Sequence, residues 1–120
     1  MRNPKISSHL LITAVFWEVF SAGSAVTALL RIGFADADID AVGVLSGPTP
    51  DLSGFFASLG VPRVEAAYYN DCFQDGAVLV LIRALPREQQ IATEVVRLHG
   101  GLLSPSYQNQ VATVQMTLGA

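Results

Sequence analysis

The sequence predicts one α+β domain over residues 1–120, an α/β sandwich with helices on one face of a small sheet. Three observations support this class. Apolar, β-branched runs occupy residues 10–17 and 77–84, segments with helical spacing lie between them, and Gly or Pro closes most segments. The predicted order is strand, helix, strand, helices, strand, helix, strand, and a ferredoxin-like topology is its natural choice. A flavodoxin-like three-layer fold is the alternative, although it ordinarily uses more strands than this length supplies.

The first half of the chain predicts a strand, a helix and a second strand. Polar residues 1–8 form a loose N-terminus, and LLITAVFW at 10–17 is the first core strand. The same region imitates a secretory signal, but Glu18 interrupts its apolar run. The helix expected next, over residues 19–32, has apolar residues at helical spacing, namely Ala22, Ala25, Val26, Leu29 and Ile32. Gly33 ends this helix, and a polar turn leads to a strand at 39–45.

Two short helices follow the turn at 46–51. Asp51 is placed to cap the first of them. Its apolar residues are Leu52, Phe55, Phe56 and Leu59. Gly60 and Pro62 separate it from the second helix, which Gly76 closes. In the second helix one face carries Val64, Tyr68 and Cys72, and a neighbouring stripe carries Tyr69 and Phe73.

The last part of the chain predicts a strand, a helix and a C-terminal extension. AVLVLIRA at 77–84 is the clearest strand, and Pro86 begins the last helix. The side of this helix predicted to be buried carries Ile91, Val95 and Leu98, and Gly100 and Gly101 stop it. In the extension at 104–120, the alternation of residues 110–118 predicts an edge strand.

Two stretches of the chain are similar to the bacterial general stress protein, or heat-induced stress protein, domain. They are AVFWEVFSAGSAVTALLRIGFADADIDAVGV at 14–44 and LGVPRVEAAYYNDCFQDGAVLVLIRA at 59–84, and VVRLHGG at 95–101 resembles the family's closing Arg-x-His-Gly. The chain departs from the family at Trp17, Val19 and Phe20, where the family is usually polar and acidic. The resemblance implies a fold and a stress-response context in a bacterium, without a defined biochemical activity.

The composition of the chain argues against several classes of binding partner. With 7 basic and 10 acidic residues the chain has a net charge of −3, and no basic cluster suggests nucleic-acid binding. No apolar run approaches the ~18 residues of a membrane span. The single cysteine excludes an internal disulfide and fits a cytoplasmic setting, and no Cys/His spacing typical of zinc is present. We therefore expect no metal and no cofactor.

Candidate functional side chains gather at residues 68–72. Tyr68, Tyr69 and Asp71 are candidates for a ligand-binding pocket, whereas the simpler interpretation makes one tyrosine a core residue with its hydroxyl at the rim. Cys72 lies near a helix C-terminus and beside acidic residues, which disfavours a reactive thiolate. No nucleophile–His–acid arrangement or phosphate-binding glycine loop is evident, so we expect no catalytic residues and no enzyme activity.

The strands also predict association. VLVLI at 78–82 is apolar on both faces, which a two-layer fold would leave partly exposed. A homodimer formed through the open sheet face is the simplest cover. One alternative is that the tail at 108–118 folds across this face or pairs with a partner's edge, and the other is that additional helices of the same chain cover it. We therefore expect a non-catalytic, homo-oligomeric domain of the stress-response type. The alternative function is a regulatory module that binds a small apolar ligand near Tyr68 and Tyr69.

Overall fold

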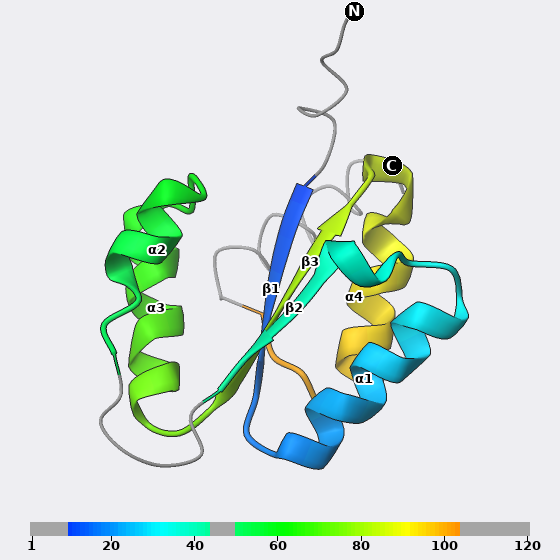
Figure 1. Cartoon of the computed structure of the whole chain (residues 1–120), viewed down its shortest axis with the longest axis horizontal. Helices are drawn as coiled ribbons and strands as arrows, with labels where there is room; N and C mark the ends of the chain where they lie inside the picture. Colours follow the sequence, from blue (N-terminus) through cyan, green and yellow to red (C-terminus); the bar gives the residue numbers. More distant parts are fainter. Residues whose placement is uncertain (1–9, 44–49, 104–120) are drawn as a thin grey trace, which may run out of the picture.

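The computed structural model describes residues 10–43 and 50–103, which form a small sheet and four α-helices (Figure 1). The strands are β1 (Leu10–Phe16), β2 (Ile39–Val42) and β3 (Val78–Ala84). The helices are α1 (Val19–Arg31), α2 (Ser53–Ser58), α3 (Arg63–Gln74) and α4 (Gln89–Leu98), with short 3₁₀ helices η2 (Asp36–Asp38) and η3 (Pro86–Glu88). This mixed architecture confirms the predicted α+β class.

The sheet has the order β1-β3-β2, and β3 is antiparallel to both neighbours. Ile82 of β3 is paired with Ile12 on one side and with Ile39 on the other. Since β1 and β2 are both antiparallel to β3, they run in the same direction with β3 between them. Val15 exchanges two backbone hydrogen bonds of 2.8 Å with Leu102, which forms an antiparallel bridge at the other edge of β1.

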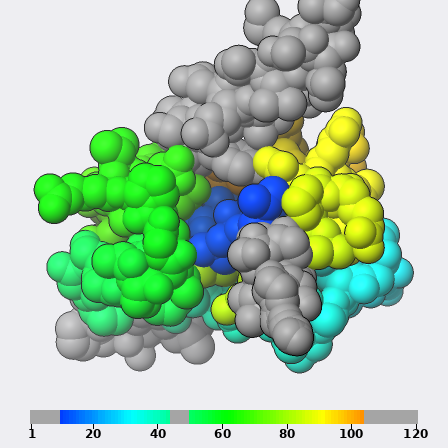
Figure 2. Space-filling model, turned by 90° about the horizontal axis from the view of Figure 1, so that it is seen from above, coloured from blue at the N-terminus to red at the C-terminus, as the bar shows by residue number. Residues whose placement is uncertain are grey.

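Helices cover both faces of the sheet. Figure 1 shows α1 and α4 on one side and α2 and α3 on the other, and Figure 2 shows β1 between α4 and the α2–α3 pair. On the first face the core contains Ile12, Ala14, Phe16, Val80 and Ile82, together with residues of α1 and α4. On the second face the core contains Val15, Leu79, Leu81, Phe56, Tyr69 and Phe73. Successive strand residues point to opposite faces, and each face meets apolar helix residues.

The prediction that helices lie on one face of the sheet is therefore wrong. The strands are apolar on both faces because the chain's own α2 and α3 cover the second face. The same observation removes the predicted dimer interface, since the sheet face that was expected to be open is packed against Phe56, Tyr69 and Phe73. Homo-oligomerisation itself stays a prediction, and it needs another surface.

Most predicted element boundaries are confirmed. The strands at 10–17 and 77–84 correspond to β1 and β3, and the helix at 19–32 corresponds to α1. Gly33 and Gly76, which follow α1 and α3, have φ angles of 114° and 104°, a left-handed conformation that favours glycine. The strand predicted at 39–45 is described to Val42. The N-terminus at 1–8, the end of that strand at 44–45 and the edge strand at 110–118 lie outside the described residues.

The buried side of the last helix differs from the prediction. Ile91 and Leu98 are 44% and 82% exposed, whereas Ala92 and Val96 are fully buried and Val95 is nearly so. The residues that face the sheet are thus Ala92 and Val96, four apart on one side of α4. A small residue at position 92 lets the helix lie close to the sheet, which explains why the larger side chains of Ile91 and Leu98 point away.

Candidate functional site

The two predicted binding tyrosines occupy different environments on α3. Tyr69 is 3% exposed, and its ring centroid lies 5.5 Å from that of Phe56 and 5.4 Å from that of Tyr68. Tyr69 is therefore a core residue that joins α3 to α2 over the sheet. Tyr68 is half-buried at the edge of this core, and Asp71 is exposed. A ligand-binding role for Tyr68, Tyr69 and Asp71 stays a prediction.

Tyr68 and Cys72 lie one turn apart on α3, and each affects the pKa of the other. Partial burial is the main cause that raises the pKa of the Tyr68 phenol, followed by the charge of a Cys72 thiolate and the hydrogen bond to it. Partial burial also raises the pKa of the Cys72 thiol. The hydrogen bond with Tyr68 opposes that rise, and the negative charges of Asp71 and Asp75 add to it. Both groups are consequently neutral near pH 7, and Cys72 is a poor nucleophile.

The raised pKa of Cys72 predicts slow alkylation at neutral pH. We expect iodoacetamide to modify Cys72 more slowly than free cysteine at pH 7.5, because the raised pKa leaves less thiolate present. The alkylation rate should rise with pH, with a midpoint above the ordinary thiol value of about 8.5. In Tyr68→Phe the midpoint should move further upward, because that variant lacks the hydrogen bond that lowers the pKa. Rapid alkylation with a midpoint below about 8 would contradict this assignment.

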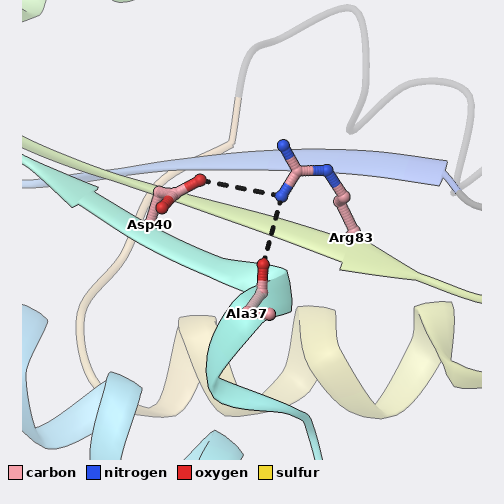
Figure 3. A network of polar contacts seen from close by, with 3 residues as sticks. All are labelled: Ala37, Asp40 and Arg83. Carbon is pink, nitrogen blue, oxygen red and sulfur yellow. Dashed lines mark hydrogen bonds and ion pairs between the residues drawn. The ribbon is translucent and has the colours of Figure 1, made fainter.

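A second polar feature links β3 to β2 and to the turn before it (Figure 3). Arg83 Nη1 lies 3.6 Å from Asp40 Oδ2 and 3.5 Å from the backbone oxygen of Ala37. Both charged side chains are about half exposed, so water screens the pair and its contribution to stability is small, about 1 kcal/mol or less. The arrangement ties the η2 turn to the sheet and offers no pair of groups for proton transfer.

An open groove of about 750 Å³ runs along α1 and reaches the end of α4. One side of α1 packs on the sheet through Ala22, Ala25 and Leu29, which leaves the groove on the outward side. His99, which also lines the groove, follows α4 and has its Nδ1 2.9 Å from the backbone oxygen of Val95. The residues that line the groove are Val19, Phe20, Gly23, Ser24, Thr27, Ala28, Arg31, Ile32 and His99.

The apolar side chains of this groove face solvent. Phe20 is 89% exposed, Val19 is 66% exposed and Ile32 is 50% exposed, and Trp17, just before α1, is also exposed. Exposed apolar residues that gather on one surface of a folded domain typically mark an interaction site. This surface was not predicted from the sequence. Its signal was the departure of Trp17, Val19 and Phe20 from the polar segment usual in the resembled family.

Two further classes of site, membrane-spanning helices and metal centres, are not found among the described residues. In residues 10–43 and 50–103, no helix has the length and apolar character needed to cross a membrane. The same residues bring together no group of three or more His, Cys, Asp or Glu side chains that could hold a metal ion. Comparisons with protein-family models, curated proteins and solved structures found no match to this chain.

Proposed function

We propose that this chain is a non-catalytic, self-associating module, and that it acts in a bacterial stress response in the cytoplasm. The observation that carries the self-association is the exposed apolar surface of α1, on which Phe20 is 89% exposed and Val19 is 66% exposed. Burying a large apolar side chain contributes about 1.5–3 kcal/mol, so covering several of them favours association. The stress-response context comes from the resemblance of residues 14–44 and 59–84 to the general stress protein domain.

We also propose a ferredoxin-like topology with α2 and α3 inserted between β2 and β3. The parallel strands β1 and β2 with β3 between them form a split βαβ unit. Both α1 and α4 pack on the same face of the sheet, as this topology requires. Leu102 bridges Val15 at the free edge of β1, where a fourth strand would begin. The inserted helices then account for the cover on the second face.

The chemistry of α3 is consistent with a module that does not catalyse. Cys72, the single cysteine of the chain, has a raised pKa and lies beside two carboxylates, which weakens it as a nucleophile. Tyr69 contributes its ring to the core of the second face. These residues therefore support the structure, and the interaction surface lies on α1.

Self-association is tested by measuring the mass of the particle in solution as concentration varies. We expect sedimentation equilibrium to return twice the 12.8 kDa mass of the chain at about 100 μM and a falling mean mass on dilution. The expected dimer follows from mass action on an apolar surface that a second copy can cover. A mass of 12.8 kDa throughout, up to about 500 μM, would contradict the proposed function.

A further inference from the structure

We propose that two copies of this chain associate through the groove on α1, with the two α1 helices packed antiparallel about a two-fold axis. This inference rests on the proposed self-association and assigns its surface and geometry. The occupant of the groove is thus the α1 helix of a second copy. A two-fold pair is closed, because the same patch is buried on both subunits and no further copy can add to it.

The shape of the groove allows a second helix to approach closely. With 3.6 residues per turn, Phe20, Ser24, Thr27 and Arg31 lie along the outward side of α1, and Gly23 flanks them. A Cβ atom added at Gly23 would meet nothing within 4 Å, so this part of the helix is open to a neighbour. Phe20, near the start of α1, projects from this surface. The small residues Gly23 and Ser24, in the middle of the helix, leave a depression on the same surface.

An antiparallel pair brings each projection to the other copy's depression. If the two-fold axis passes between Gly23 and Ser24, Phe20 of one copy lies against Thr27 of the second copy, and the reverse contact forms by symmetry. Phe20 then covers the small residues beside Thr27 and loses its exposure. A parallel pair would instead place the two Phe20 side chains against each other and the two small segments against each other, which leaves a gap.

The charges at the two ends of α1 also favour the antiparallel arrangement of the two helices. Glu18 lies immediately before α1, Arg31 is its last residue, and both are exposed. Within residues 10–43 and 50–103 the ion pair is that of Arg83 with Asp40, so neither Glu18 nor Arg31 is paired with another residue of these ranges. In the antiparallel pair Glu18 of each copy lies near Arg31 of the other, whereas a parallel pair would bring like charges together.

Substitution at Gly23 tests the position of the interface. We expect Gly23→Glu to weaken dimerisation at least 10-fold, because a bulky charge would enter an apolar contact and face its symmetry mate. The open space at Gly23 and the better helix propensity of Glu should leave the subunit folded, which far-UV circular dichroism checks. The matched control is Ala67→Glu, an exposed position on α3 with the same change in charge, where the dissociation constant should stay within 2-fold.

A charge exchange tests the antiparallel direction. We expect Glu18→Lys and Arg31→Glu each to weaken the dimer roughly 5-fold, and the double variant to restore the original dissociation constant within about 2-fold. If Gly23→Glu leaves a stable dimer intact, the interface lies elsewhere and this inference fails, while the proposed self-association stands. If the double variant is not restored, the antiparallel arrangement is overturned. If the unaltered chain is monomeric, both proposals fail.

Discussion

Replacement of Phe56 by alanine is expected to lower the free energy of unfolding by about 3–5 kcal/mol, although α2 has only six residues. Phe56 is fully buried, and its ring lies 5.5 Å from that of Tyr69, over the face of the sheet that carries Val15 and Leu79. Truncation removes the apolar contacts of the ring and leaves a cavity between α2, α3 and the sheet. Urea unfolding followed by circular dichroism at one fixed protein concentration measures the loss.

The adjacent residue provides a matched control. Phe55 has the same side chain on the same helix, but it is 42% exposed and touches Phe56 in an edge-to-face contact with centroids 5.4 Å apart. Phe55→Ala should therefore lower the free energy of unfolding by about 1 kcal/mol, chiefly through that contact. Equal and small effects at Phe55 and Phe56 would mean that α2 does not cover the sheet, and the three-layer arrangement would be wrong.

The strands and the ends of the helices could be predicted because their signals are local. The run at 78–82 is wholly apolar, and its β-branched residues are Val78, Val80 and Ile82. Gly33 and Gly76 stop the preceding helices through their positive φ angles. These features depend on a few neighbouring residues. Sequence alone therefore places them within one or two positions of their observed ends.

The cover on the second sheet face could not be predicted in the same way. A strand that is apolar on both sides requires two covers, but its sequence does not say whether the second comes from the same chain or from a partner. The short α2 buries only Phe56 fully, so its pattern carries little information about the surface that it meets. Long-range packing of Phe56 on Tyr69 decides the outcome.

The candidate surface was missed for a related reason. The apolar stripe of α1 was predicted from Ala22, Ala25, Val26, Leu29 and Ile32. Ala22, Ala25 and Leu29 are buried, whereas Ile32 is 50% exposed. Phe20 was not recognised as lying on the opposite side of the helix. Similarly, Ile91, Val95 and Leu98 of α4 were expected in the core. Val95 is there, but Ala92 and Val96 take the places expected of Ile91 and Leu98. Size and hydrophobicity alone do not decide which side of a helix meets the sheet, because close approach favours small residues.

Gly101 is the second position where a single change should have a large effect. A Cβ atom at this residue would lie 2.5 Å from Val96 Cγ1 and 2.6 Å from Phe16 Cζ, well inside van der Waals contact. Both neighbours are fully buried in the core of the first face, so neither side chain can move into solvent. We expect Gly101→Ala to lower the free energy of unfolding by about 2–3 kcal/mol, measured by urea unfolding. Gly54→Ala, with nothing within 4 Å of the new atom, should change it by less than about 1 kcal/mol.

A second substitution shows whether Gly101→Ala destabilises the protein by crowding Val96 or by disturbing the backbone that follows α4. Val96→Ala removes the methyl group nearest to position 101, so it should lose about 1–2.5 kcal/mol by itself but create room for the added atom. The double variant should therefore lose less unfolding free energy than the sum of the losses in the two single variants, by about 1 kcal/mol or more. Strict additivity would mean that crowding against Val96 is not the cause. The alternative is a disturbed path of the backbone from α4 to Leu102, whose hydrogen bonds with Val15 hold this segment at the edge of β1.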